Sequence, residues 1–357
     1  MITRTLAIVA HAALLVAGAC SSESDDAPAE DGQSASSAGS GATSSVSSTG
    51  SGGGSSGSGG GSTGGTGGVD QGPDVDLSDP QLYEFELDPH VLDPTTVDSL
   101  ETQYAQLDTR TTPLGKLLVF LPGANNVPSD WRQHGIKLAE FGYHVLIPHY
   151  NNRWSSEGVC DGQGGSCSLD TRWEALVGED ASSAIDISRA DSAEGRVVTM
   201  LQHLTTAHPG GDWGYYLEDD GSLRYQDMVI AGISHGAAST GLYAIRRPFS
   251  RAVLHSSGPA GDPGETKLTP VDQWYAFAHT EDPAYDPIVS SWDSFGLLGA
   301  LTSIDGSSAP YGDSHRLITS AGTTYPHCSV VVHSSSPLDG NEYVFEPAWR
   351  YLYGVAP

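Results

Sequence analysis

Short apolar runs alternate with longer amphipathic stretches from about residue 80 onward. Residues 116–121, KLLVFL, form a nearly continuous apolar run, as a parallel strand buried on both faces should. This alternation of strands and helices predicts an α/β fold with a doubly wound, mostly parallel sheet. The predicted strands are residues 82–86, 103–108, 116–121, 143–148, 228–231, 251–255, 274–279 and 317–320, and the predicted helices are residues 129–141, 193–207 and 237–247.

The expected elements fit one domain, residues 78–357, because α/β folds of this length often remain undivided. Strands 82–86 and 103–108 are expected to pair antiparallel at one edge. Ser129 is the predicted N-cap of helix 129–141, and Gly142 its stop signal. Fewer than twenty residues separate strands 251–255 and 274–279, so no large lid domain is expected. Any cover over the site would come from residues 151–191 or 283–315.

Residues 1–20 are predicted to be an export signal. Arg4 supplies a positive charge, residues 6–16 are apolar but too few to span a bilayer, and VAGAC ends in Cys20. The cysteine at this place is similar to a bacterial lipobox, which predicts lipidation of Cys20 and an exported lipoprotein. Ser21 follows, where Asp would indicate inner-membrane retention, so the outer membrane or cell surface is expected. The alternative is a secreted protein cut nearby.

Residues 21–77 are predicted to be a disordered linker of mainly Ser, Gly, Ala and Thr, with too little apolar surface to fold. Its length would hold the domain on average ~40 Å from a membrane. The whole chain has 16 Lys and Arg against 44 Asp and Glu, a formal net charge of −28. Nucleic acid and anionic membrane surfaces are therefore poor partners on electrostatic grounds, and neither is expected. The expected membrane contact is the lipid anchor alone.

Ser234 is the candidate nucleophile. It lies in MVIAGISHGAAS, where an apolar strand, a turn with glycines on both sides of the serine, and a helix follow each other. This order is the signature of a nucleophile elbow. The five-residue pattern also occurs at residues 53–57 and 60–64, but there it lies in the Gly/Ser run with no strand or helix around it. The structural alternative for Ser234 is a Gly-rich turn that merely packs closely.

An elbow serine needs an acid after a later strand and a histidine near the end of the chain. Asp282 lies just beyond strand 274–279 and is the predicted acid, with Glu281 and Asp286 as alternatives. His327 lies early in the loop after strand 317–320 and is the predicted base. His333 is the alternative, but it follows a second apolar run that would carry it away.

The loop after strand 116–121 is expected to complete the site. In LPGANN the backbone N–H of Ala124 would join that of His235 to form an oxyanion hole. Gly123 would let the backbone approach the substrate. The alternative is an ordinary Pro-Gly turn.

Cys160 and Cys167 bracket a short polar loop, DGQGGS, in a chain predicted to be exported. This arrangement predicts a disulfide that stabilises the fold by about 2–3 kcal/mol. A metal site is the less favoured interpretation, because no further ligand pair at zinc spacing lies nearby. Cys328 is then expected to be a free thiol, buried as a small apolar side chain.

The chain resembles the α/β-hydrolase superfamily over residues 80–357. It also resembles a family of secreted bacterial hydrolases, through LPGANNVPSDW, GYHVLIPHYNN, the Cys160/Cys167 loop, RWEALVG, DSAEGRVVTMLQHL, GISHGA and PHCSVV. Ile233 stands where this family usually has a more polar residue, which should change the shape of the site more than its mechanism. The resemblance implies a hydrolase fold and activity.

The predicted function is a serine hydrolase that cleaves small or polymeric carboxylic esters through Ser234, His327 and Asp282. A peptidase or thioesterase of the same fold, or a surface binding protein without turnover, remains an alternative. No cofactor is expected, since the sequence has no HExxH, zinc spacing or Rossmann fingerprint. The Asp-rich stretches 70–79 and 218–220 are weak calcium candidates and are more simply interpreted as solvated turns.

Overall fold

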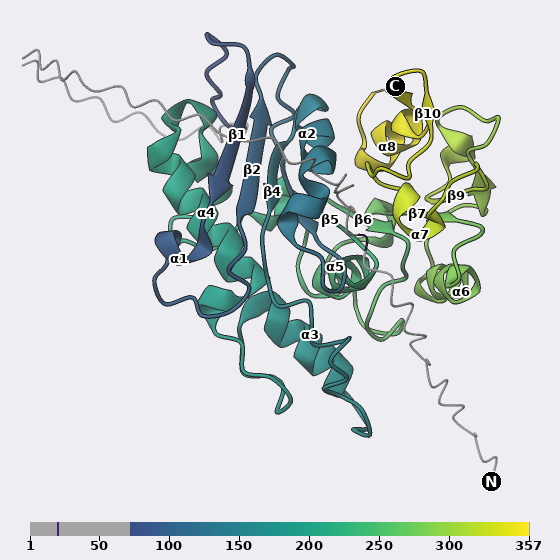
Figure 1. The fold of residues 1–357 in the computed structure, drawn as a ribbon, viewed down its shortest axis with the longest axis horizontal. Coiled ribbons are helices and arrows are strands. Elements are labelled where there is room, and N and C mark those ends of the chain that lie inside the picture. Colours follow the sequence, from purple (N-terminus) through teal and green to yellow (C-terminus); the bar gives the residue numbers. More distant parts are fainter. Residues whose placement is uncertain (1–19, 21–71, 357) are drawn as a thin grey trace, which may run out of the picture. The chain divides into compact units, whose positions relative to one another are not determined.

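A nine-stranded sheet runs through the part of the chain that the computed structural model describes, which is Cys20 and residues 72–356 (Figure 1). In chain order its strands are β1 Leu82–Leu87, β2 Gln103–Asp108, β3 Leu117–Leu121, β4 His144–Ile147, β5 Met228–Ile233, β6 Arg251–His255, β7 Trp274–His279, β8 Thr302–Ser303 and β9 Arg316–Thr319. A separate hairpin pairs β10 Leu338–Asp339 with β11 Glu342–Tyr343.

The strand order across the sheet is β1-β2-β4-β3-β5-β6-β7-β9-β8. Only the pairs β1–β2 and β2–β4 are antiparallel within this sheet, and its other neighbours run parallel. This mostly parallel order, with helices on both faces, is the α/β-hydrolase fold. The predicted doubly wound sheet and its antiparallel edge pair are confirmed.

Helices cover both faces of the sheet. They are α1 Pro89–Leu92, α2 Arg132–Glu140, α3 Cys167–Val177, α4 Ala193–Ala207, α5 His235–Arg246, α6 Tyr285–Phe295, α7 Pro326–Ser329 and α8 Glu346–Tyr353. Two apolar clusters show how they divide. One cluster contains side chains of α3, α4, α5 and α6, and the other contains side chains of α2, α7 and α8.

The strand β3 shows why the sheet needs helices on both sides. Leu117, Val119 and Leu121 belong to the first apolar cluster, whereas Leu118 and Phe120 belong to the second. Successive side chains of a strand point to opposite faces, so a run with no polar position must be covered twice. The continuous apolar sequence of this strand is therefore explained by its central place in the sheet.

The helix predicted over residues 129–141 begins differently from the expectation. A 3-10 turn at Pro128–Trp131 precedes α2, whose N-cap is Trp131 and not Ser129. The Asp130 carboxylate accepts the backbone N–H of Val127 at 3.0 Å and so stabilises this turn in place of a serine cap. The prediction of Ser129 as N-cap was wrong, while the stop near Gly142 was correct.

The first described residues after the gap already contact the domain. The backbone N–H of Asp74 donates to the Asp212 carboxylate at 2.8 Å, and that of Asp76 donates to the Gly210 carbonyl at 2.8 Å. Apart from Cys20, the predicted signal segment 1–20 lies outside the described residues, as do residues 21–71 of the predicted linker. Within the described chain, no helix is both long and apolar enough to cross a bilayer.

The connection between β6 and β7 is short. Residues 256–273 contain one helical turn, a 3-10 segment at Val271–Gln273, and no α-helix. No large lid domain is inserted there, as predicted. The carboxyl ends of the parallel strands β3, β5, β6 and β7 lie at one edge of the sheet. In open α/β sheets ligands bind outside this edge.

Candidate active site

Ser234 occupies a sharp turn between β5 and α5. Its φ of 55° and ψ of −121° lie in a region that a residue with a side chain rarely adopts and that costs on the order of 1–3 kcal/mol. The neighbouring chain holds this conformation, because the Ser234 N–H donates to the His255 carbonyl at 2.9 Å. The Ser234 carbonyl in turn accepts the Ala238 N–H at 3.0 Å. The half-buried side chain is thus presented between a strand end and a helix start.

The glycines on either side of Ser234 are required by close approach of the backbone. A Cβ on Gly232 would lie 2.6 Å from the carbonyl carbon of Gly236. A Cβ on Gly236 would lie 2.1 Å from the carbonyl oxygen of Leu121, at the end of β3. No real side chain tolerates such distances. Glycine at both positions therefore lets α5 pack directly against the strand ends.

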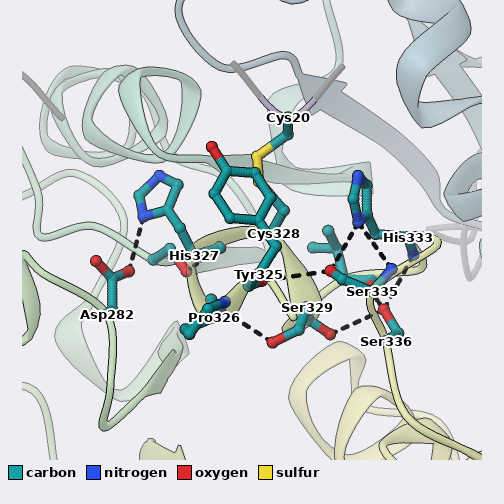
Figure 2. Close-up of a disulfide and its surroundings, with 12 residues drawn as sticks. Cys20, Asp282, Tyr325, Pro326, His327, Cys328, Ser329, His333, Ser335 and Ser336 are labelled. Carbon is teal, nitrogen blue, oxygen red and sulfur yellow. Dashed lines mark hydrogen bonds and ion pairs between the residues drawn. A yellow bond between two sulfur atoms is a disulfide. The ribbon is translucent and has the colours of Figure 1, made fainter. Parts of the chain in front are cut away.

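Asp282 and His327 form a buried pair beside the sheet. Asp282 follows β7, and the Nδ1 of His327, in α7, donates to its Oδ2 at 2.7 Å (Figure 2). The exposed fractions of the two side chains are 0% for Asp282 and 9% for His327. The other carboxylate oxygen, Oδ1, accepts the backbone N–H of Ala284 at 2.9 Å. Because an ionised carboxylate only accepts hydrogen bonds, this contact places a proton on Nδ1, so that Nε2 is the acceptor in the neutral imidazole.

Ser256 connects the histidine segment to the elbow. It directly follows His255, which is paired in register with Ile233 and accepts the Ser234 N–H. The Oγ of Ser256 donates to the backbone carbonyl of His327 at 2.6 Å. The histidine is therefore fixed at the carboxyl end of β6, next to the strand that carries Ser234. Between the side chains of Ser234 and His327, the described residues have no hydrogen bond.

The alternative acid and base positions lie elsewhere. Glu281 and Asp286 are exposed, and neither contacts a histidine through its carboxylate among the described residues. The Nδ1 of His333 forms a hydrogen bond with the Oγ of Ser335 at 2.7 Å. Figure 2 shows His333 on the far side of the segment from His327 and Asp282. The structure brings Asp282 together with His327 and leaves the alternatives apart.

The predicted oxyanion-hole loop lies beside the elbow. A Cβ built on Gly123 would lie 3.4 Å from the Cβ of Ser234, so this loop passes close to the serine. Ala124 follows at a half-buried position, and His235 begins α5. Within residues 72–356, neither the Ala124 N–H nor the His235 N–H has a hydrogen-bond acceptor. Both N–H groups are therefore candidate donors to an oxygen atom of a substrate.

Two residues that the sequence analysis did not single out hold this loop in place. The Nδ2 of Asn152 donates to the carbonyls of Gly123 and Asn126, each at 2.7 Å. The hydroxyl of Tyr150 donates to the carbonyl of Pro122 at 3.2 Å. Both lie in the motif GYHVLIPHYNN, which supports the family resemblance but from which no site residue was predicted. Buried polar residues just after a central strand were the signal that could have found them.

His235 is buried, and its surroundings disfavour a charged imidazole. Burial and the nearby Arg172 guanidinium lower the pKa of His235 well below its ordinary value. The imidazole packs against Trp154, with ring centroids 5.0 Å apart. The uncharged imidazole therefore packs as a wall beside Trp154, and the contribution predicted for His235 is that of its backbone N–H.

The two cysteine predictions had different outcomes. Cys160 and Cys167 form the predicted disulfide, with Cα atoms 5.9 Å apart. Cys328 is not a free thiol, however, because it is bonded to Cys20 (Figure 2). Both cysteines of this second disulfide are buried, with exposed fractions of 0% for Cys328 and 2% for Cys20.

The Cys20–Cys328 disulfide corrects one expectation and bears on a second. The expected free thiol at Cys328 was wrong, since its buried sulfur atom has a partner. Lipidation of Cys20 stays a prediction, and it is an alternative to this bond, because a sulfur atom in a disulfide cannot also carry a thioether-linked lipid. The export motif accounts for a cysteine at position 20, but it does not indicate which atom the sulfur of that cysteine is bonded to. The bond joins residue 20 to the segment that carries His327.

The described residues include no group of three or more His, Cys, Asp or Glu side chains arranged to hold a metal ion. Residues 218–220 and 72–79, which contain the weak calcium candidates, are covered by this finding. Asp70 lies outside the described residues. The acidic stretch around Asp76 contacts the backbone of its own turn, since the Ser78 N–H donates to the Asp76 carboxylate at 2.9 Å.

No protein-family model matches the sequence, and no curated protein does. Solved structures do match. Esterase B from Lactobacillus rhamnosis is 11% identical, and the match covers 69% of this chain and 77% of that protein with a TM-score of 0.37. The feruloyl esterase module from Clostridium thermocellum is 9% identical, with 68% and 80% covered and a TM-score of 0.33. At such low identities, the fold assignment rests on the strand order and the elbow of this chain.

Proposed function

We propose that this α/β-hydrolase fold is a serine hydrolase that cleaves carboxylic esters, with Ser234 as nucleophile, His327 as base and Asp282 as the acid that orients it. One combination of observations carries the proposal. A serine is held at positive φ in a strand-to-helix turn, and a buried Asp–His pair with a free Nε2 lies at the same edge of the sheet. Positioned nucleophile, base and orienting acid are the three parts that acyl transfer requires.

In the first half of the reaction, the Nε2 of His327 takes the hydroxyl proton of Ser234 as Oγ bonds to the ester carbonyl carbon. Asp282 keeps the Nδ1 proton in place and stabilises the imidazolium that forms. The carbonyl oxygen becomes an oxyanion, and the backbone N–H groups of Ala124 and His235 donate hydrogen bonds to it. The oxyanion then collapses and the bond between the acyl carbon and the alcohol oxygen breaks. The imidazolium gives its proton to that oxygen, so an alcohol departs and an acyl-enzyme remains on Ser234.

In the second half, water replaces the alcohol. His327 takes a proton from the water molecule as its oxygen bonds to the acyl carbon. The second oxyanion collapses, the bond to Ser234 Oγ breaks, and His327 returns the proton to that oxygen. The products are a carboxylic acid and the unchanged enzyme. No step requires a redox change or an added cofactor.

The proposal places the protein outside the cytoplasm, by export through the segment 1–20. The Cys160–Cys167 disulfide supports it, because such bonds persist mainly in oxidising compartments. Peptide mapping of the protein purified from cells tests this. We expect segment 1–20 to be absent, and an intact segment 1–20 would contradict export.

A fluorophosphonate probe followed by a series of p-nitrophenyl esters tests the proposed chemistry. We expect the probe to label Ser234 and the wild type to hydrolyse short esters, with Ser234→Ala abolishing both. The exposed serine Ser294 provides a matched control, since Ser294→Ala should label and turn over like wild type. Extending the series to long acyl chains and to an insoluble polyester distinguishes small from polymeric substrates. Full labelling of Ser234→Ala would refute the assignment of the nucleophile.

A further inference from the structure

Arg172, in α3, is a buried cation without a carboxylate partner. Its exposed fraction is 8%, and it forms no ion pair with any described Asp or Glu. Its Nε is buried without any hydrogen-bond partner. The other buried arginine, Arg196, is paired with the carboxylate of Asp191 at 2.8 Å. Among the described residues, one buried guanidinium is therefore compensated by an anion and the other is not.

The guanidinium of Arg172 lies against the first turn of α5. Its Nη1 donates to the backbone carbonyl of His235 at 2.9 Å and to the Oγ of Ser239 at 2.6 Å. The same Ser239 hydroxyl donates to the His235 carbonyl at 3.0 Å. Arg172 thus binds directly to the residue that follows the proposed nucleophile.

The remaining neighbours of Arg172 belong to the oxyanion-hole side of the site. The ring of Trp154 covers the guanidinium, with its centroid 5.1 Å from Cζ. Tyr150, the nearby phenol that favours the charged form of Arg172, donates its hydroxyl to the carbonyl of Pro122. Pro122 lies two residues before Ala124. The guanidinium is therefore enclosed between α5 and the residues that support the oxyanion-hole loop.

Arg172 remains charged in this enclosure. Burial lowers its pKa to about 10, which is still well above neutral pH. Because the guanidinium is largely removed from bulk solvent, the field of its charge is screened less than at the surface. The positive end of the α5 dipole points to the same place. Both contributions favour negative charge near the His235 N–H.

We propose that Arg172 is a positioning residue of the oxyanion hole, whose uncompensated charge stabilises the oxyanion through the first turn of α5. This inference rests on the proposed function of Ser234. The charge develops in the transition state and is absent from the bound ester. The contribution of Arg172 should therefore fall on kcat and leave KM nearly unchanged.

Active-site titration with the fluorophosphonate, followed by kinetics per titrated site, tests this role. We expect Arg172→Gln to lower kcat by about 10-fold to 100-fold. Loss of a direct oxyanion donor lowers kcat by up to about 1000-fold, which is more than we expect here. KM should stay within about 3-fold of wild type. Arg172→Lys keeps a positive charge and should restore most of kcat. Affinity for a boronic acid, which mimics the tetrahedral state, should fall in Arg172→Gln in parallel with kcat.

The pH profile separates charge from packing. A buried ammonium loses its proton more readily than a guanidinium, so kcat of Arg172→Lys should decline at a lower alkaline pH than kcat of the wild type. A purely structural role for Arg172 would not produce this shift. Identical alkaline limbs for the two proteins would overturn the proposal.

Arg196→Gln is the matched control, because it removes the other buried arginine away from the elbow. It should lower stability and leave kcat per titrated site unchanged. Should Arg172→Gln not fold, Arg172→Lys still decides the question through its alkaline limb. Wild-type kcat per site in Arg172→Gln, together with an inactive Ser234→Ala, would refute the role of Arg172 alone. An active Ser234→Ala would instead refute the proposed function.

Discussion

His327 and Asp282 are 45 positions apart in the chain, yet the Nδ1 of the histidine lies 2.7 Å from an oxygen of the carboxylate. Asp282 follows β7, while His327 follows β9, the next strand across the sheet. Adjacent parallel strands end at the same edge, so loops that follow them meet there. The pairing of these two residues is therefore a consequence of strand order.

Asp282→Asn should lower kcat by about 10⁴-fold, because an amide can donate to Nδ1 and so favours the wrong imidazole tautomer. The fold should persist, since Asn is nearly the same size. Ester hydrolysis and a circular dichroism spectrum check both parts. Asp286→Asn is the control, as Asp286 is exposed in the first turn of α6. A greater loss in Asp286→Asn than in Asp282→Asn would contradict the assigned acid.

The positions of Ser234, Asp282 and His327 could be predicted because each follows a strand with a clear apolar pattern. β6 and β7 have the predicted bounds, and the elbow strand differs only at its end. Once the strands are ordered, residues just beyond their carboxyl ends are restricted to a few candidates. For Asp282 the sequence offered two rivals, Glu281 and Asp286, one and four positions away. Burial and the contact with His327 separate Asp282 from them.

Other parts of the site depend on tertiary contacts that leave no local pattern. Arg172 lies in a helix that the sequence analysis did not predict, and its contacts with α5 span more than 60 positions. The bond between Cys20 and Cys328 spans 308 positions, and the intervening linker sequence gives no indication of it. Asn152 acts through its side-chain amide on a loop 26 to 29 positions away.

Gly236→Ala should destabilise the protein by several kcal/mol, on the scale of overpacked sites or above it. The new Cβ would meet the carbonyl of Leu121, which is backbone and cannot rotate away. Relieving the clash moves α5 or the oxyanion-hole loop, so kcat per titrated site should fall too. Gly322→Ala is the control, since no atom lies within 4 Å of its Cβ position. Urea unfolding of the two variants compares them directly, and equal stability would argue against the close packing.

Ser234→Gly should be more stable than Ser234→Ala by about 1 kcal/mol. Both variants lack the nucleophile, but only glycine adopts the positive φ of 55° without strain. The greater chain entropy of unfolded glycine offsets part of this gain. Chemical denaturation of the pair measures the difference. An alanine variant as stable as the glycine variant would mean that the elbow backbone relaxes in solution.

The Cys20–Cys328 bond predicts a single cross-linked peptide in a digest made without reductant. Mass spectrometry should find Cys20 joined to Cys328 and Cys160 joined to Cys167, with no alkylation before reduction. Cys328→Ser should release Cys20 as an alkylatable thiol while Cys160–Cys167 stays intact. A diacylglyceryl group on Cys20 together with an alkylatable Cys328 would show that lipidation replaces the bond in the cell.

Acid should destabilise the fold through histidines that are buried in the neutral form. Burial lowers the pKa of His144 and of His149 to about 4, and that of His255 to about 3, from an ordinary value of 6.5. As the pH falls below 6.5 the unfolded chain binds these protons before the folded one does. The stabilisation is therefore complete above pH 6.5 and is lost progressively as the pH falls toward 4.

Each such histidine contributes a slope of about 1.4 kcal/mol per pH unit to the free energy of unfolding, and the three together about 4 kcal/mol per pH unit. Urea titrations between pH 7 and pH 4.5 measure this slope. His144→Asn should make the slope shallower by about one proton, because the imidazole at this buried position is gone. His203→Asn, at an exposed position, should leave the slope unchanged. If the free energy of unfolding did not change with pH over this range, these histidines would bind protons equally well in the folded and the unfolded protein, and the prediction would be wrong.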